Sequence, residues 1–294
     1  MICISASEHK GSNQATLPIN LCDKTAARIT PKGFFLSALC GTTTANPSRQ
    51  SPFPIPKSPL GYRVGYATTD LITGNKAVCA QFKTIGVNGV YLTQIEVDTG
   101  TDTKVTASTG VKIQILDADG YKDKMYTFHK GDSKGFKTDG WYNEANQLIT
   151  TANDVFFPVG TGLWFGGKAG YSIRTAGEVI TTAQTFDLIA GNTMLANPYP
   201  APVKLTSFIM GTGSDTKVTA SAGVKIQILD ADGYKDKMYT FHKGDSKGFK
   251  TDGWYNEANQ LITADNDITF QPGDAMWFGG KAGYTVTIPS PIAQ

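Results

Sequence analysis

Apolar and polar residues alternate along several short stretches of this 294-residue chain. In the clearest stretch, Val111, Ile113 and Ile115 alternate with Lys112 and Gln114. A period of two places the apolar side chains on one face of an extended strand, where a sheet can bury them. Stretches of similar character, separated by glycine and asparagine, predict further strands at residues 64–71, 77–82, 91–97, 154–157, 162–165 and 171–174. Short strands at this density are typical of a β-sandwich or barrel.

A hairpin turn is expected directly after the clearest strand. Asp119 and Gly120 tolerate the positive φ that a type I′ turn requires, so they are predicted to be its two loop residues. This turn pairs apolar residues with apolar residues and a charge with its opposite. The predicted register sets Asp117 opposite Lys122, Ile113 opposite Tyr126 and Val111 opposite Phe128.

The chain contains a tandem duplication. Residues 102–150 recur as residues 215–263, 113 positions downstream, and Thr109 against Ala222 is the only mismatch in these 49 residues. The similarity continues on both sides in weaker form, for example in the Trp-Phe-Gly-Gly-Lys segments that begin at Trp164 and Trp277. A repeat of this length makes the repeat the unit of folding. The sequence therefore predicts two all-β domains, β-sandwich or barrel-like, at residues 61–174 and 175–294, behind an N-terminal arm at residues 1–60.

The identity of the repeats extends to charged positions. Two explanations stay open, a recent duplication or a surface that is used twice, because solvated charges usually tolerate change at a cost of about 0.5 kcal/mol or less. The lysines that return unchanged are Lys122, Lys124, Lys130, Lys134 and Lys137, as Lys235, Lys237, Lys243, Lys247 and Lys250.

Composition and charge exclude several classes of partner. The formal net charge is +2, and eight lysines face eight carboxylates between residues 102 and 170, so no basic stripe is available for phosphates. We therefore expect no nucleic-acid partner. No stretch reaches the roughly 20 apolar residues of a spanning helix, so no membrane span is expected.

The first 60 residues differ from the remainder of the chain. Three of the four cysteines, Cys3, Cys22 and Cys40, lie there, and five prolines fall between Pro47 and Pro59. This composition predicts an arm, linker or leader. The fourth cysteine, Cys79, has Ala196 at the equivalent place, so no disulfide or metal site is built into the repeat and no cofactor is expected.

Closely spaced aspartates near a glycine suggest a calcium loop, since hard cations bind converging oxygen ligands. The segment departs from the EF-hand pattern, because Tyr121 replaces a ligand, Phe128 replaces the bidentate glutamate and two lysines would repel the ion. An ordinary hairpin explains the aspartates better. The candidate calcium residues are Asp117, Asp119, Asp123 and their copies Asp230, Asp232 and Asp236.

His129 and His242 are the only histidines of the repeats, and each precedes Lys-Gly-Asp-Ser. A histidine near Asp132 and Ser133 suggests nucleophilic catalysis, which needs a base within hydrogen-bond reach of the hydroxyl. Three residues in one run at a glycine turn are better explained as a loop at a strand end. No paired-carboxylate or metal constellation occurs outside the turns, so we expect that the protein is not an enzyme.

Aromatic pairs beside turn residues give a stronger signal. Such rings stack on sugars while their polar edges bind hydroxyl groups, so Trp141, Tyr142, Trp254 and Tyr255 are candidate carbohydrate-binding residues. The alternative is that these four residues lie in the core, and the sequence alone does not distinguish an exposed binding role from a core position. For the remaining tryptophans, Trp164 and Trp277, apolar neighbours favour a core position.

The order of turn motifs resembles repeat units of secreted or surface-exposed bacterial β-sandwich proteins. The residues that carry the resemblance are Gly191-Asn192, Asn-Pro-Tyr-Pro at 197–200, Gly253-Trp254, and Pro272-Gly273 before Trp277-Phe278. The first repeat departs from the pattern, with Ala80-Gln81-Phe82 in place of Asn-Pro-Tyr and Val159 in place of the proline. The resemblance implies an extracellular or cell-surface setting and a role in display or assembly, and it implies no reaction.

Together these features predict a structural or adhesive surface protein. The arm can add as a strand to the sheet edge of a neighbouring copy, and a head-to-tail contact that does not close builds a filament. The expected partner is then the protein itself. The alternative is a tandem carbohydrate-binding protein that binds an extracellular polysaccharide through exposed Trp-Tyr pairs.

Overall fold

The computed structural model describes residues 63–106, 108, 110–131, 136, 138–219, 224–244, 249 and 251–292. All of them belong to one structural unit, Ser51–Gln294, which includes both repeats. The predicted arm at residues 1–60, with Cys3, Cys22 and Cys40, lies outside the described residues, and its assembly role stays a prediction.

The protein is all-β, as the alternating pattern predicted. Small antiparallel sheets make up each repeat, and single 3-10 turns are the only helical elements among the described residues. The first repeat contains β1 (Val64–Asp70), β2 (Gly74–Val78), β3 (Phe82–Lys83), β4 (Gly89–Tyr91), η1 (Leu92–Gln94), β5 (Glu96–Asp98), β6 (Lys112–Leu116), β7 (Lys122–His129), β8 (Gly140–Tyr142), β9 (Phe156–Pro158), β10 (Leu163–Gly167) and β11 (Ser172–Val179).

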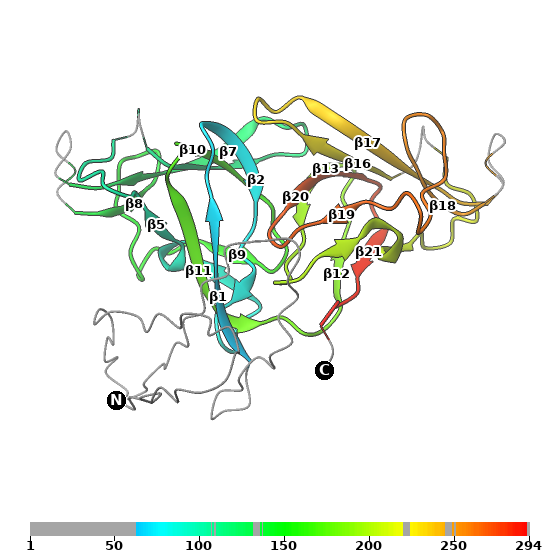
Figure 1. The fold of residues 1–294 in the computed structure, drawn as a ribbon, viewed down its shortest axis with the longest axis horizontal. Helices are drawn as coiled ribbons and strands as arrows, with labels where there is room; N and C mark the ends of the chain where they lie inside the picture. The colour runs from blue at the N-terminus through cyan, green and yellow to red at the C-terminus, as the bar shows by residue number, and fades with distance from the viewer. Residues whose placement is uncertain are drawn as a thin grey trace, which may run out of the picture. The chain divides into compact units, whose positions relative to one another are not determined.

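The second repeat, coloured from green to red in Figure 1, has the same order of elements except that no strand corresponds to β3. It contains β12 (Gln184–Asp187), β13 (Gly191–Ala196), β14 (Val203–Lys204), η2 (Leu205–Ser207), β15 (Ile209–Gly211), β16 (Lys225–Leu229), β17 (Lys235–His242), β18 (Gly253–Tyr255), β19 (Thr269–Phe270), β20 (Ala275–Gly280) and β21 (Thr285–Ile288).

Two larger sheets build each repeat. In the first repeat, the strand order of the larger sheet is β2-β10-β6-β7-β8, and the other sheet is β1-β11-β3 with β5 also paired to β11. The second repeat has the matching sheets β13-β20-β16-β17-β18 and β12-β21-β15. The small ladders β4-β9 and β14-β19 complete the pattern.

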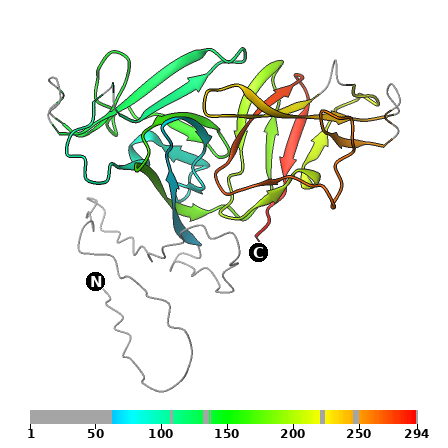
Figure 2. The ribbon, with the colours of Figure 1, turned by 45° about the horizontal axis from the view of Figure 1, so that its top comes forward.

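Each repeat has its own hydrophobic core, and both larger sheets contribute to it. In the first repeat, Ile113 and Phe165 of the five-stranded sheet share one buried cluster with Ile173 of the four-stranded sheet. In the second repeat, the equivalent residues Phe278 and Val286 belong to another buried cluster. Figure 2 shows the strands of the two repeats as two groups, one coloured blue to green and the other green to red. In β11 the buried residues Ile173 and Thr175 alternate with the exposed residues Arg174 and Ala176, so a period of two reflects burial on one sheet face.

Most predicted strands are present, and two differ for identifiable reasons. The stretch 77–82 divides into β2 and β3 because Cys79 leaves the sheet and donates its N–H to Gly273 O at 3.0 Å, in the second repeat. The stretch 91–97 is interrupted by η1, where the Asp154 carboxylate accepts the N–H of Thr93 at 3.2 Å. Strand β11 is longer than predicted and runs through the expected domain boundary at residue 174.

The hairpin of β6 and β7 forms with the predicted core register, Ile113 opposite Tyr126. The predicted two-residue turn is wrong, because a bulge after Ile115 sets Leu116 opposite Lys122. Gly120 N–H donates to Asp117 O at 3.0 Å and Gly120 has φ +87°, the geometry of a type I turn followed by a glycine bulge. The predicted Asp117–Lys122 pair is therefore not formed.

Candidate functional site

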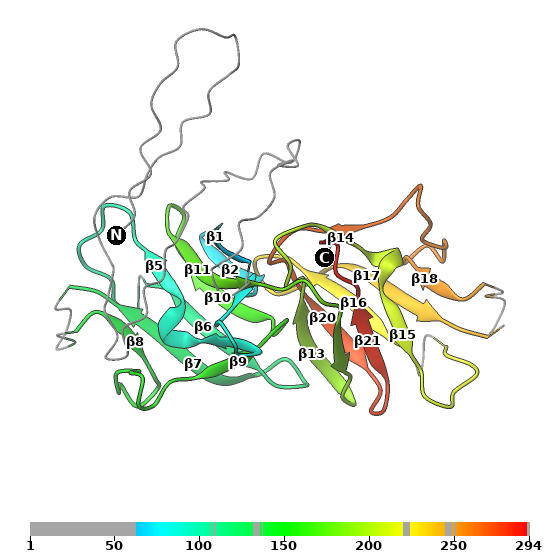
Figure 3. The ribbon, with the colours of Figure 1, turned by 90° about the horizontal axis from the view of Figure 1, so that it is seen from below.

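The two repeats meet along the outer edges of β2 and β13 (Figure 3). Asn75 of β2 donates its N–H to Ala231 O at 3.1 Å, and Asn192 of β13 donates its N–H to Ala118 O at 3.0 Å. Each edge strand thus receives a backbone partner from the hairpin loop of the other repeat. This contact satisfies donors that an edge strand would otherwise expose.

A second pair of bonds repeats the same exchange. Cys79 donates its N–H to Gly273 O at 3.0 Å, and Ala196, its equivalent, donates to Gly160 O at 3.0 Å. Contacts that return with the two partners exchanged define an isologous interface, which has two-fold symmetry. The two repeats are therefore related as the subunits of a symmetric dimer, within one chain.

Tryptophans from both repeats lie at this interface. Trp164 and Trp277 are each 6% exposed and form a small cluster with Met194. The hairpin turn of one repeat covers the tryptophan of the other: a Cβ at Gly120 would stand 3.4 Å from the Trp277 ring, and a Cβ at Gly233 would stand 3.4 Å from the Trp164 ring. The predicted core position of the two tryptophans is confirmed, and it lies between the repeats.

A groove of about 550 Å³ opens beside the two tryptophans. Its size falls within the roughly 300–1,000 Å³ of typical ligand sites. The same seven positions of each repeat line it, so the two halves of the groove are equivalent. The lining residues are Gln114, Leu116, Asp119, Gly120, Tyr121, Lys122 and Trp164, with Gln227, Leu229, Asp232, Gly233, Tyr234, Lys235 and Trp277.

Two tyrosines of the hairpin tips border the groove. Tyr121 is 74% exposed and Tyr234 is 73% exposed. A single exposed aromatic side chain needs no explanation, whereas several exposed apolar side chains in one place can mark an interaction site. Here two such side chains belong to one groove, which makes them candidates for ligand contact.

Several polar groups of the groove have no partner within the protein. Gln114 and Gln227 make no side-chain hydrogen bond in the described part of the chain. The indole N–H groups of Trp164 and Trp277 also have no acceptor among the described residues, and neither nitrogen is fully buried. These groups can donate hydrogen bonds to a ligand without breaking an existing contact.

The charges of the groove cancel. Asp119 and Asp232 carry one negative charge each, and Lys122 and Lys235 carry one positive charge each. Lys122 is already paired with Glu144, and Lys235 is paired with Glu257 in the same way. The groove therefore offers no excess positive charge to an anionic ligand.

Among the aspartates considered as candidate calcium ligands, Asp117 and its copy Asp230 stabilise the hairpin turn. Asp117 Oδ1 accepts the N–H groups of Asp119 at 3.0 Å and of Tyr121 at 2.9 Å. Asp230 makes the same two contacts in the second repeat. Across the described ranges, no three His, Cys, Asp or Glu side chains are arranged to hold a metal ion. The candidates Asp117, Asp119, Asp123, Asp230, Asp232 and Asp236 thus form no such group.

The aromatic pairs predicted to bind carbohydrate are buried. Trp141 is 3% exposed and its indole N–H donates to Ile95 O at 3.1 Å, while Tyr142 is 7% exposed. Trp254 and Tyr255 are equally buried in the second repeat. The sequence left exposure and a core position open for these pairs, and the structure buries them. Trp141 and Trp254 belong to the core clusters, and Tyr142 and Tyr255 pack edge-on against the buried histidines. The role of these pairs in sugar binding stays a prediction without an open ring face to support it.

The histidine of each repeat lies in an aromatic cluster. His129 is buried and stacks on Phe136 with ring centroids 3.8 Å apart, and His242 stacks on Phe249 at the same distance. The Nδ1 atoms of both histidines have no hydrogen-bond partner, and burial lowers the pKa of both imidazoles. Asp132 and Ser133, the other members of the suggested trio, lie outside the described residues.

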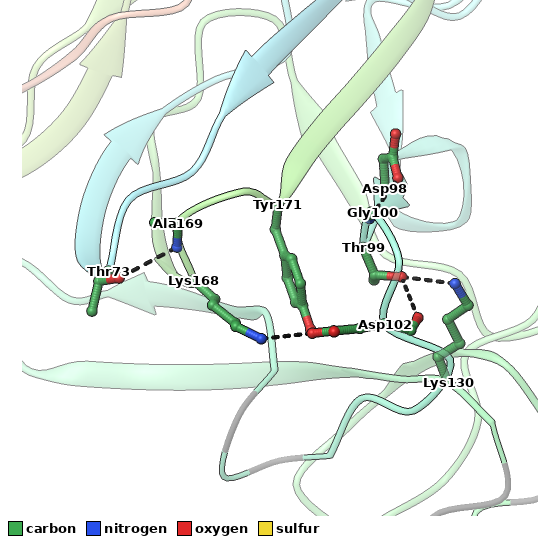
Figure 4. Close-up of polar contacts among 9 residues, drawn as sticks. All are labelled: Thr73, Asp98, Thr99, Gly100, Asp102, Lys130, Lys168, Ala169 and Tyr171. Atoms are coloured by element: carbon green, nitrogen blue, oxygen red, sulfur yellow. Dashed lines mark hydrogen bonds and ion pairs between the residues drawn. The ribbon is translucent and has the colours of Figure 1, made fainter.

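A polar cluster occupies the turn between β10 and β11 (Figure 4). Asp102 Oδ2 accepts hydrogen bonds from Lys168 Nζ at 2.6 Å and from the Tyr171 hydroxyl at 2.5 Å. These two bonds lower the pKa of the Asp102 carboxyl. Lys130 Nζ donates to Thr99 Oγ1 at 2.7 Å on the same loop. Because each polar group already has a partner, the cluster fastens the loop to the strand.

The second repeat contains the same polar cluster. Asp215 accepts from Lys281 at 2.5 Å and from Tyr284 at 2.5 Å. The hydrogen bond from Lys281 comes first among the causes that lower the pKa of Asp215. A cluster that occurs in both repeats away from the groove is explained by its structural role.

Neither Tyr121 nor Tyr234 was predicted from the sequence to be a binding residue. Tyr121 was noted only because it departs from the pattern of a calcium loop. The sequence did contain a sign that both are exposed. Each tyrosine directly follows the Asp-Gly turn of a hairpin and lies outside the stretch in which apolar and polar residues alternate. The sequence of one repeat could not reveal that both repeats form the groove, because the tryptophan beside each hairpin tip belongs to the other repeat.

Comparisons with protein-family models, with curated proteins and with solved structures find no match to this chain. Among the described residues, no helix is long and apolar enough to cross a membrane.

Proposed function

We propose that the protein is a non-enzymatic adhesive protein of the cell surface or extracellular space, and that it binds carbohydrate in the groove between its repeats. The observation that carries the proposal is the pair of exposed tyrosines, Tyr121 and Tyr234, beside two indole N–H groups in one groove. Aromatic faces stack on the C–H faces of sugar rings, and unpartnered donors bind the sugar hydroxyl groups.

The proposal keeps the carbohydrate-binding class and changes the residues assigned to it. Trp141 and Tyr142 are replaced as binding residues by Tyr121 and its copy, because the former are buried. The surface or extracellular setting rests on the resemblance of the turn motifs to secreted bacterial repeat proteins. The description of each repeat as a β-sandwich is also part of the proposal, and a core shared by two sheets supports it.

Assembly through the N-terminal arm is a second proposal. Strand β12 pairs on one side only among the described residues, with β21. An unpaired strand edge can accept an extended segment from another copy. The chain therefore offers both an N-terminal segment that can act as the donor and a strand edge that can accept it.

A pull-down with neutral and acidic polysaccharides tests the carbohydrate proposal. The full-length protein should bind at least one neutral polysaccharide in a saturable manner. The double variant Tyr121→Ala, Tyr234→Ala should bind roughly tenfold more weakly or worse, because two stacking contacts are lost. Its unfolding temperature should match that of the parent, since both side chains are exposed.

Ile209→Ala is a matched control, because Ile209 is 62% exposed and does not line the groove. Equal binding by the parent and by the tyrosine double variant would contradict the carbohydrate proposal.

Negative-stain electron microscopy of the full-length protein and of a version without residues 1–60 tests the assembly proposal. Filaments from the full-length chain alone are expected, and dispersed particles from both would contradict it.

A further inference from the structure

The groove is built from two equivalent half-sites, and each half-site is composite. Gly120 of the first repeat lies against Trp277 of the second, and Tyr121 follows Gly120 in the chain. The other half-site combines Tyr234 with Trp164 in the same way. Neither repeat alone contains a complete half-site.

The half-sites open into one groove. Residues of both hairpins and both tryptophans line the same space of about 550 Å³. A ligand that leaves one half-site along the groove therefore enters the other. The two ends present the same side chains in orientations related by the two-fold axis. A linear ligand with a ring face at each end can contact both, because stacking on an aromatic ring does not require one direction of the chain.

We infer that the groove holds one linear chain of neutral sugars, which spans both half-sites at once. This inference rests on the proposed carbohydrate-binding function and specifies the length and charge of the ligand. The balanced charges of Asp119, Asp232, Lys122 and Lys235 disfavour an acidic polymer, because no positive charge is left over to bind it. Gln114 and Gln227 offer uncharged donors and acceptors at equivalent places along the groove.

A chain that contacts both half-sites gains affinity without any new type of contact. Once one end is bound, the other end is held near the second half-site at a high effective concentration. Shorter oligomers reach one half-site only, so two of them can bind to one protein. Stoichiometry and affinity should therefore both change at a threshold length.

Isothermal titration calorimetry of the full-length protein tests the inference. The probes are the cello-, malto-, laminari-, xylo- and manno-oligosaccharides of two to eight units, with oligogalacturonate as the acidic control. In at least one neutral series, short members should bind two per protein, and longer members should bind one per protein with roughly 100-fold higher affinity. Oligogalacturonate should not bind.

The single variant Tyr121→Ala makes the test specific. Short oligomers should bind it once per protein with the parental dissociation constant, and long oligomers should lose most of their gain in affinity. The variant Tyr234→Ala should behave identically, because the half-sites are equivalent. Ile209→Ala should leave every value unchanged.

Four outcomes would overturn the inference. If long oligomers bind two per protein with the affinity of short ones, the half-sites act independently, and the proposed carbohydrate function survives. If oligogalacturonate binds as well as the neutral series, the neutral class is wrong. If no sugar binds, both proposals fail. A synthetic peptide of residues 50–60 is titrated as well, and its binding at Tyr121 in place of every sugar would reassign the groove to a proline-rich segment.

Discussion

Asn197 is the most connected buried polar side chain of the second repeat. Its side-chain N–H groups donate to Ala201 O at 2.9 Å, Gln271 O at 3.1 Å and Phe270 O at 3.2 Å, and its Oδ1 accepts the N–H of Tyr199 at 3.0 Å. The side chain thus satisfies backbone groups that would otherwise be buried without a partner. This role explains the first residue of the Asn-Pro-Tyr-Pro motif in structural terms.

Asn197→Ala should lower the free energy of unfolding by about 1–3 kcal/mol, because it leaves buried carbonyl groups without a donor. Chemical denaturation with urea would measure the change. Gln184→Ala is the control, since the Gln184 amide bonds only to exposed neighbouring groups and should cost little. An unchanged midpoint for Asn197→Ala would show that water replaces the amide.

The two buried histidines couple stability to pH. Burial lowers the pKa of His129 and of His242 in the folded protein, whereas the unfolded chain has the ordinary value of about 6.5. Below that value the unfolded state binds more protons than the folded state. The free energy of unfolding is therefore highest above about pH 6.5 and falls as the pH decreases toward the lowered pKa.

The double variant His129→Phe, His242→Phe should remove this dependence, because phenylalanine keeps a flat ring in the stack and does not titrate. Urea denaturation at steps between pH 7.5 and 5.5 would measure the slope. We expect a parent that loses stability over this interval and a variant that does not. Equal slopes for the two proteins would assign the pH response to other groups.

The hairpins are the elements on which the groove depends. Their core register follows from the alternation of apolar residues, and it was predictable from the positions of Ile113 and Tyr126. The type of turn was not predictable in this way, because Asp117 accepts two backbone N–H groups and thereby favours a type I turn with a glycine bulge. Side-chain hydrogen bonds of this kind compete with the ladder, and an alternating pattern does not report them.

Asp117→Ala and Asp230→Ala together should weaken carbohydrate binding, because each aspartate fixes the N–H of the groove tyrosine, Tyr121 or Tyr234. The loss should be smaller than that of the tyrosine double variant, since the rings remain. Asn substitutions, whose side-chain oxygen can accept the same bonds, should restore binding. Calorimetry with the neutral oligosaccharides measures both effects, and full binding by the alanine variant would contradict this role.

At the scale of the whole molecule, the duplication creates a symmetric contact that the sequence repeat alone did not reveal. The pattern predicted two domains, yet it gave no sign that β2 and β13 take partners from opposite repeats. Such contacts join residues that are far apart in the sequence, for example Asn75 and Ala231, and they depend on tertiary packing. The groove also gives a reason for part of the repeat identity, because Gln114 and Tyr121 are used in both copies.

The interface should hold the repeats together without a covalent link. A protease site inserted between the exposed residues Thr182 and Ala183 allows the chain to be cut between the two repeats. We expect the two fragments to elute together in size-exclusion chromatography, because the exchanged backbone bonds and the cluster of Trp164 and Trp277 remain buried between them.

Trp277→Ala removes a buried ring, a loss of about 3–5 kcal/mol, and should let the cleaved fragments separate. The same variant without cleavage controls for global unfolding. Separation of the parental fragments in native buffer would mean that the linker, and not the interface, holds the two half-sites in one groove.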